Sequence, residues 1–432
     1  MPSIWQNDCE MPEFPQLSGN AEADVLIIGG GLAGILAAYF LKSEGLDCIV
    51  CEGGRICGGV TGLTTAKITA QHRLIYSRIA EEFDVKTAGK YLSANLIALD
   101  KYRSFCKGID CNFEEKDSFI YSRNDRKKLD DELHILDRLD FPAEFAKELP
   151  LPFNTVGAVR FPSQAQFHPL KFAAAIAQGL RIYENTFIGR VKGHAAYSDR
   201  GKVKARYIIC TSHFPIINRY GAYFLKLYQD RSYVMALENA ADYDGMYADE
   251  NESGLSFRNS GKYLLLGGGG HRTGKKSCGF SELSEFAKKH YPNAKTAAKW
   301  AAQDCMTLDG IPYIGKYSPL SENLYVSTGY GKWGMTSAMI SAMLLTDIIT
   351  GQENEFSELF SPNRTIFRKQ LFVNAAEAVC NLVTPTIPRC PHMGCALKRN
   401  PEENSWDCPC HGSRFDKNGK LRDNPAMKDA NI

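Results

Sequence analysis

The stretch that decides the fold is Asp24-Val25-Leu26-Ile27-Ile28-Gly29-Gly30-Gly31-Leu32-Ala33-Gly34. Its first five residues form an apolar run that predicts a short buried strand, and the glycines that follow fit a G-x-G-x-x-G pattern. The chain continues into a helical run over residues 35–45 and a second apolar strand over 47–51, which ends at Glu52. This order of strand, glycine turn, helix and strand predicts a βαβ unit.

The three pattern glycines have different predicted roles at one dinucleotide site. Gly29 permits the tight turn, Gly31 lets the backbone approach a pyrophosphate, and Gly34 lets the helix pack closely against the strand. The pyrophosphate would lie at the helix N-terminus, where free N–H groups and the helix dipole attract an anion. Glu52 stands where a carboxylate can bond a ribose hydroxyl. We therefore expect these residues to bind a dinucleotide.

A second motif lies near the C-terminus, where residues 390–392 read C-x-H and residues 408–411 read C-x-x-H. Two cysteines and two histidines in this arrangement can hold a two-iron cluster with the cysteines on one iron and the histidines on the other. The spacing assigns the ligands as Cys390, His392, Cys408 and His411. Zinc is the alternative metal, although a zinc knuckle uses Cys-x-x-Cys pairs and neither loop has one.

The C-terminal segment resembles the cluster-binding part of Rieske proteins. The resemblance implies a disulfide between Cys395 and Cys410, which would tie the two cluster loops together. A complete Rieske domain has strands before its first loop, whereas here the expected helical connector, residues 356–381, ends shortly before the first ligand. We therefore expect a shortened all-β segment over residues 382–432, and a vestigial site stays open as an interpretation.

Two other segments resemble parts of FAD-binding proteins that lie beside the flavin ring. After Glu52, a glycine-rich run with Arg55 leads to Thr64, Thr65 and Lys67, whose polar groups suit a flavin, although a capped helix start would also explain them. Farther along, a strand and a glycine loop lead into a helix expected to end at a glycine C-cap. Backbone N–H groups at its start would stabilise the charge of a reduced flavin. The residues expected there are Gly331, Gly334, Met335 and Thr336.

Candidates for substrate contact follow a glycine-rich strand end at residues 267–270. His271 and Arg272 come next, and arginine can grip a carboxylate through two parallel hydrogen bonds. A surface pair beside a flexible loop is an equal interpretation. His168 is more simply a structural residue at a helix start, and Cys305 is more simply a buried thiol than a covalent flavin link.

The composition is that of an ordinary globular protein, with a net charge of +2 over 432 residues. This balance predicts neither a nucleic-acid nor a membrane surface. Residues 1–23 have no apolar core run, so they predict no signal or transit peptide, and the longest apolar stretch, near 335–349, is too short to span a bilayer. We expect a cytoplasmic protein whose other cysteines are mostly reduced.

The glycine unit at 24–34, the run at 307–315 and the loop at 329–336 together resemble the glycine/D-amino-acid oxidase (DAO-like) flavoproteins. The resemblance implies FAD and an α/β fold, in which a Rossmann-like FAD-binding domain is interleaved with an antiparallel-sheet substrate domain. It covers about residues 22–355, after an N-terminal extension of residues 1–21. The FAD-binding parts would be about 22–80, 155–220 and 305–355, and the substrate parts about 81–154 and 221–304.

With its C-terminal segment, the whole chain looks like the bacterial FAD-dependent oxidoreductases that carry a Rieske domain. That resemblance implies hydride transfer from an amine or amino-acid-like substrate to FAD, followed by single-electron transfer through a [2Fe-2S] cluster to an unidentified acceptor. Polyols are a second substrate class in the wider family. Two alternatives stay open: an electron-transfer protein without small-molecule turnover, and an oxygen-using oxidase with a decayed cluster segment.

Overall fold

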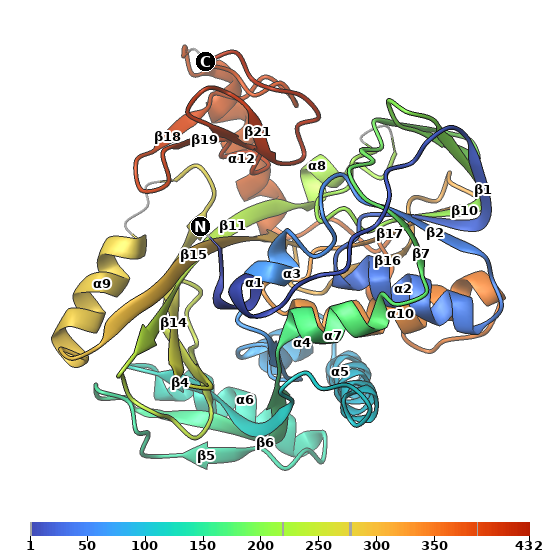
Figure 1. The fold of residues 1–432 in the computed structure, drawn as a ribbon. Helices are drawn as coiled ribbons and strands as arrows, with labels where there is room; N and C mark the ends of the chain where they lie inside the picture. The colour runs from blue at the N-terminus through green and yellow to red at the C-terminus, as the bar shows by residue number, and fades with distance from the viewer. Residues whose placement is uncertain (1, 218–219, 276–278, 387) are drawn as a thin grey trace.

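The first predicted strand lies at the centre of a mostly parallel sheet (Figure 1). β1 (Ala21–Ile28) pairs in parallel with β2 (Cys48–Cys51) on one side and with β10 (Lys202–Cys210) on the other. The computed structural model describes residues 2–217, 220–275, 279–386 and 388–432. The other strands of this sheet are β7 (Arg181–Tyr183), β8 (Arg190–Lys192), β9 (Ala195–Tyr197), β16 (Tyr313–Lys316) and β17 (Leu324–Thr328).

Two apolar helices pack together beside this sheet. α2 (Leu32–Ser43) follows the glycine turn, and α10 (Gly334–Thr350) ends at Gly351, whose φ of +78° makes it the predicted glycine C-cap. Both helices are hydrophobic on nearly all sides, and their buried residues share one core with β1. The N-termini of these two packed helices therefore hold the two glycine segments that are expected to bind the flavin.

A second, nine-stranded sheet lies beside the first, with the strand order β15-β11-β14-β13-β12-β4-β6-β3 and β5 paired to β6. Most adjacent strands in this sheet are antiparallel. The predicted α/β fold, in which a Rossmann-like domain is interleaved with an antiparallel-sheet domain, is therefore confirmed. Its strands are β3 (Lys67–Ile68), β4 (Glu114–Ser122), β5 (Glu144–Ala146), β6 (Gly157–Gln166), β11 (Tyr228–Glu238), β12 (Met246–Asp249), β13 (Ser256–Ser260), β14 (Tyr263–Arg272) and β15 (Lys295–Met306).

Three local features differ from the sequence-based expectations. The sequence predicts one strand over residues 182–191, whereas the structure has two, β7 and β8, separated by a bend and an irregular segment. The glycine-rich run at 267–270 predicts a bend after the preceding strand, whereas these glycines lie within β14, where Gly267 and Gly268 pair with β11. β3 and β6 fall inside ranges expected for FAD binding, but they join the nine-stranded sheet because β6 pairs along its length with β4.

Helices cover the two sheets and the loops between them (Figure 1). The N-terminal extension is part of the core, since Trp5 in the first helix is buried and its Nε1 donates to Thr64 O at 2.7 Å. None of the described helices is both long and apolar enough to cross a bilayer. The remaining helices are α1 (Ile4–Asp8), α3 (Val60–Leu63), α4 (Ile75–Glu82), α5 (Val85–Cys106), α6 (Arg126–Arg138), α7 (Pro169–Ile176), α8 (Tyr223–Lys226), α9 (Gly279–His290) and α11 (Ser357–Phe360).

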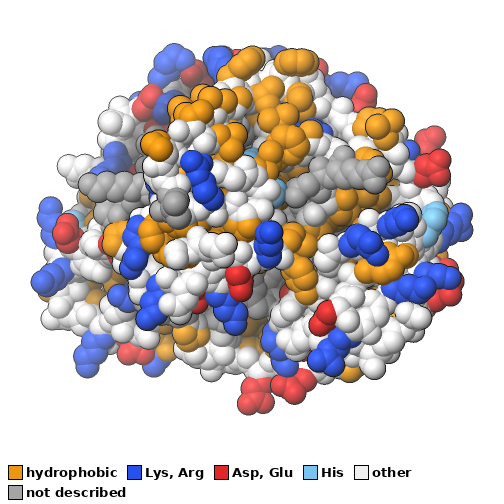
Figure 2. Space-filling view, turned by 90° about the horizontal axis from the view of Figure 1, so that it is seen from above, with side chains coloured by type: hydrophobic (Ala, Val, Ile, Leu, Met, Phe, Trp, Pro, Cys, Tyr) orange, Lys and Arg blue, Asp and Glu red, His pale blue; other side chains and the backbone are white. Residues whose placement is uncertain are grey.

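The C-terminal segment is a small four-stranded antiparallel sheet reached through α12 (Lys369–Val383). α12 buries Asn374 and Asn381 and leaves apolar side chains such as Phe372 exposed. Figure 2 views the molecule from this side and shows hydrophobic side chains gathered on its surface. The sheet strands are β18 (Lys398–Asn400), β19 (Ser405–Asp407), β20 (Arg414–Asp416) and β21 (Leu421–Asp423).

Candidate functional site

A cavity of about 700 Å³ is lined by residues of both large sheets and of the C-terminal segment. This volume suits a cofactor-sized ligand, since binding cavities are usually about 300–1,000 Å³. Eight of the residues predicted to bind the cofactor line it: Gly29, Gly31, Glu52, Thr64, Thr65, Lys67, Gly334 and Met335. The structure therefore brings together segments that are far apart in the sequence.

The glycine turn after β1 leaves no room for a side chain at Gly29 or Gly34. Gly29 has a φ of +117°, and a Cβ there would lie 2.8 Å from Thr211 O. A Cβ on Gly34 would lie 2.0 Å from Gly29 O, so this glycine packs against the turn and does not line the cavity. Glu52 accepts from Gly30 N at 2.7 Å and from Gly54 N at 2.8 Å. These contacts hold the turn in place at the edge of the cavity, where the sequence predicts the pyrophosphate site.

The segment after α3 presents Thr64, Thr65 and Lys67 to the cavity. Buried Arg258 holds this segment by donating to Thr65 O at 2.7 Å and to Ala66 O at 2.8 Å. The Lys67 amine has no hydrogen bond or ion pair among the described residues. Burial, with repulsion from Arg258 and Arg73, lowers the pKa of Lys67 to about 7. Lys67 is therefore a cavity amine that can be charged or neutral near neutral pH.

The start of α10 forms another wall of the cavity through Gly334 and Met335. Thr336 lies behind that wall, where its hydroxyl is 3.1 Å from His72 Nε2. Gly331 is also outside the lining, and its N–H donates to Cys305 O at 3.0 Å. Cys305 itself lines the cavity, and burial raises the pKa of its thiol to about 12, which makes it a poor nucleophile.

His271 and Arg272 lie at the end of β14, outside the cavity lining. His271 stacks on Tyr233, with ring centroids 5.8 Å apart. Arg272 donates to Pro409 O at 3.0 Å and to Cys410 O at 3.1 Å. These contacts place Arg272 against the second cluster loop, where it holds that loop to the nine-stranded sheet.

Charged residues that the sequence analysis did not select line the cavity instead. Asp304 and Lys332 both face it, and Lys332 pairs with Asp230 at 3.4 Å. Burial raises the pKa of Asp304 to about 6, although Lys332 opposes this shift. A sequence signal for Asp304 existed, since it follows the apolar run 300–302 within one strand. The charge of a buried strand residue is informative because acids are rarely buried without a partner or a function.

The four predicted cluster ligands come together in two adjacent loops. Cys390 and Cys408 are buried, and the rings of His392 and His411 are 5.0 Å apart between centroids. His411 Nε2 is 2.9 Å from Phe224 O, while His411 Nδ1 and both ring nitrogens of His392 have no hydrogen-bond partner in the described part of the chain. Buried nitrogens without partners are the expected state of metal-ligand positions, so this donor set fits a two-iron cluster.

Cys395 and Cys410, the pair that the Rieske resemblance implies, are joined by a disulfide in the structure. It joins the two cluster loops, and each loop is also closed by its own backbone hydrogen bonds. Cys390 N donates to Cys395 O at 2.8 Å, and Cys408 N donates to Ser413 O at 2.8 Å. The loops therefore hold the ligand positions through covalent and backbone contacts that do not depend on the metal.

The cluster segment forms part of the wall of the flavin cavity. Arg414, Asp423, Asn424 and Ala426 line the same cavity as the glycine turn. Asn424 Nδ2 donates to Ser212 O and to Phe214 O, both at 2.8 Å. The two predicted cofactor sites thus adjoin each other within one chain.

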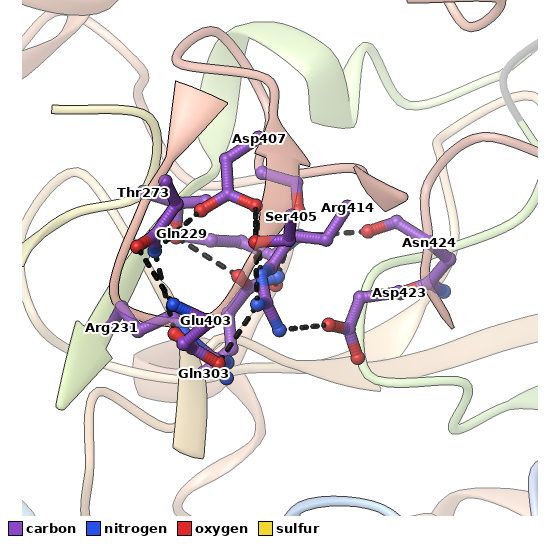
Figure 3. A network of polar contacts seen from close by, with 12 residues as sticks. Gln229, Arg231, Thr273, Gln303, Glu403, Ser405, Asp407, Arg414, Asp423 and Asn424 are labelled. Atoms are coloured by element: carbon purple, nitrogen blue, oxygen red, sulfur yellow. Dashed lines mark hydrogen bonds and ion pairs between the residues drawn. The ribbon is translucent and has the colours of Figure 1, made fainter. Parts of the chain in front are cut away.

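An ion network fixes this arrangement (Figure 3). Glu403 pairs with Arg231 of β11 and, at 2.9 Å, with Arg414, which also contacts Asp407 at 3.0 Å and Asp423 at 2.9 Å. Burial opposes ionisation of Glu403, but the two arginines outweigh it and hold its pKa at about 2. Breaking one member of such a buried group is costly because it leaves an unpaired charge.

Comparison with known proteins agrees with this two-part description. The sequence matches the FAD dependent oxidoreductase family over residues 24–348 and the Rieske [2Fe-2S] domain over residues 351–432. The second match begins well before residue 382, where we expected the shortened cluster segment to start.

Individual proteins show the same likeness. The chain is 32% identical to a putative Rieske 2Fe-2S iron–sulfur protein, YhfW, of Bacillus subtilis, over 99% of this chain and 96% of that protein. It is 22% identical to gamma-glutamylputrescine oxidoreductase of Escherichia coli, over 79% and 87% of the two chains. The crystal structure of glycine oxidase from Geobacillus kaustophilus superposes with a TM-score of 0.68 at 21% identity, covering 80% of this chain and 100% of that one.

Proposed function

The chain belongs to the FAD-dependent oxidoreductase family and carries a Rieske [2Fe-2S] domain, and from this premise we propose that it oxidises an amine or amino-acid-like compound and delivers the electrons singly to an acceptor. FAD supplies hydride acceptance and one-electron donation, and histidine ligation gives a Rieske cluster a higher potential than an all-cysteine cluster. The observation that carries the proposal is the shared wall. Asp423, Asn424 and Ala426 of the Rieske segment line the cavity that contains Gly29 and Gly31.

The charges in the cavity support the proposed substrate class. Asp304 provides a carboxylate that can pair with an ammonium group, and its pKa of about 6 lets it take up a proton from that group. Lys67 and Lys332 provide cations for a carboxylate. A compound with both charges could pair its ammonium group with Asp304 and its carboxylate with Lys67, whereas a polyol would leave Lys67 without an ionic partner. Relatives that act on glycine and gamma-glutamylputrescine are consistent with this class.

The test uses the protein with both cofactors bound, mixed anaerobically with a panel of amines, amino acids and polyols. We expect an amine or amino acid to bleach the flavin and to produce the electron paramagnetic resonance signal of a reduced Rieske cluster. Flavin bleaching without a cluster signal, together with fast oxygen uptake in a separate aerobic assay, would support the oxidase alternative. Bleaching by none of the compounds would support an electron-transfer protein without small-molecule turnover.

A further inference from the structure

Gln229 occupies the junction between the flavin cavity and the cluster. It lies at the start of β11 and is 1% exposed. Its amide nitrogen donates to His411 O at 2.7 Å and to Asn424 O at 3.1 Å. A buried amide whose donors are both used on the cluster segment is held in one orientation, because any rotation would leave a buried donor without an acceptor.

The other end of this amide faces residues of the cavity wall. Gln229 Oε1 accepts from Gln303 Nε2 at 2.8 Å and lies 3.2 Å from His213 Nε2. Both Gln303 and His213 line the cavity, whereas Gln229 does not. Gln303 also donates to Gly412 O at 2.8 Å, and Thr273 fixes it by donating to Gln303 Oε1 at 3.0 Å (Figure 3). Two cavity residues therefore converge on one side chain that bonds a ligand residue of the cluster.

The two predicted histidine ligands differ in their surroundings. His411 is buried against the flavin half, with its carbonyl on Gln229 and its ring on Phe224 O. His392 is more open, and it adjoins Met393, which is 43% exposed. The side of the cluster that faces the flavin cavity is therefore the His411 side.

We propose that Gln229 is the positioning residue through which the flavin cavity is coupled to the cluster, and that electrons enter the cluster on its His411 side; this rests on the proposed function. In each transfer one electron leaves the reduced flavin and one enters the oxidised cluster, without a change in any covalent bond of the protein. The acceptor would reoxidise the cluster after the first transfer, so that a second transfer could remove the other electron of the substrate hydride, and its proton would pass to solvent. Gln229 neither gains nor loses an electron or a proton.

The test compares Gln229→Leu with Asn374→Leu, which makes the same kind of change at another buried amide. Asn374 of α12 is 5% exposed and also bridges the two halves, because its Oδ1 accepts from Arg272 at 2.8 Å and its Nδ2 donates to Leu225 O at 3.4 Å. It lies outside the cavity lining. A general loosening of the interface would affect both variants, whereas loss of the coupling would affect only Gln229→Leu.

The measurement needs no substrate. A pulse of photoreduced 5-deazariboflavin donates electrons to the full-length protein with both cofactors, and absorbance then follows their transfer from flavin to cluster. We expect Gln229→Leu to slow this transfer about tenfold or more, the size of effect usual for residues that position a metal ligand. We expect Asn374→Leu to keep the wild-type rate, and both variants to keep the wild-type iron content. An unchanged cluster midpoint potential in Gln229→Leu would attribute the slower rate to the coupling and not to the driving force.

Equal rates in Gln229→Leu and the wild-type protein would overturn the inference, as would equal slowing in both variants. If Gln229→Leu loses its cluster, Gln303→Leu takes its place, since it removes the bonds to Gln229 Oε1 and Gly412 O, and an unchanged rate there would also overturn the inference. Absence of transfer in the wild-type protein is a different result, because it would contradict the proposed function itself.

Discussion

The flavin cavity and the cluster loops hold their cofactors with different parts of the polypeptide. At the cavity, close packing of the backbone determines the shape of the glycine turn, because a Cβ on Gly34 would lie 2.0 Å from Gly29 O. At the cluster the predicted ligands are side chains, namely those of Cys390, Cys408 and the two histidines. The two sites should therefore be sensitive to different changes. We expect flavin binding to be lost when an atom is added at the glycine turn, and the cluster to be lost when a ligand atom is removed.

The largest effect should come from removing one thiolate ligand. Cys408→Ser replaces a buried thiol that is one of four predicted ligands, so we expect complete loss of the [2Fe-2S] cluster with the flavin retained. Iron analysis and the electron paramagnetic resonance spectrum of the reduced protein measure the cluster content, and flavin absorbance measures the flavin content. Cys380→Ser is the control, since this free cysteine is exposed on α12. A cluster that survives in Cys408→Ser would contradict the ligand assignment.

The opposite change, adding one methyl group at the flavin turn, should have the next largest effect. Gly34→Ala places a Cβ against Gly29 O, and relief of this clash must move the turn. Overpacking of this kind costs roughly 1–3 kcal/mol or more. We expect reduced flavin content together with a lower thermal midpoint, measured by flavin absorbance and circular dichroism.

Gly189→Ala is the matched control for this change, because a Cβ there would have no neighbour within 4 Å. Normal flavin content in Gly34→Ala would show that the turn can shift without losing its shape. That result would contradict the view that the flavin site depends on backbone packing while the cluster site depends on side chains.

The same contrast explains which features the sequence could predict. The glycine turn and the predicted ligand pairs are local patterns, so each carries its own signal. The structure has the turn between β1 and α2, and it brings the rings of the two predicted histidine ligands within 5.0 Å of each other. The residues that join the two sites are distant in sequence: Gln229 reaches His411 over 182 positions and Arg231 reaches Glu403 over 172. Single glutamine and glutamate residues have no periodicity or spacing that would reveal such partners.

His271 and Arg272 show the converse case. Their position after a glycine-rich run suggested a loop beside the substrate, but the run is a paired strand, and Arg272 contacts the second cluster loop. The sequence indicated that Arg272 follows a glycine-rich run at which another segment or a ligand can approach the backbone closely. It could not show that the approaching backbone was that of the cluster segment, because the docking of one segment on another is set by tertiary contacts alone.

A smaller effect should follow when the ion network between the two sites is broken. Glu403 is 12% exposed, and its pKa of about 2 is below the ordinary value of 4.5. Its stabilisation is therefore complete above about pH 4.5 and is lost as the pH falls towards 2, which corresponds to about 3 kcal/mol. We expect Glu403→Gln to lower the free energy of unfolding by this amount at pH 7, with the difference from the wild-type protein shrinking below pH 4.5.

Urea unfolding followed by circular dichroism at several pH values measures this difference. Glu402→Gln is the control, because the neighbouring carboxylate accepts from Ser281 at 2.7 Å on the surface and takes no part in the network. A Glu403→Gln variant as stable as the wild-type protein would indicate that Asp407 and Asp423 are sufficient partners for Arg414. The cluster segment would then be held mainly by its uncharged contacts.

The smallest expected effect is a change in the flavin midpoint potential on substitution of Lys67, whose side chain lines the flavin cavity. Its pKa of about 7 makes it charged below pH 7 and neutral above it. A positive charge in the cavity favours the anionic reduced flavin, so the flavin midpoint potential of the wild-type protein should exceed that of Lys67→Met at pH 6 and approach it at pH 8. Lys67→Arg should keep the difference at both pH values because arginine stays charged. Potentiometric titration of the flavin measures all three proteins, and parallel pH dependences for the wild-type and Met proteins would place Lys67 too far from the flavin ring to act on it.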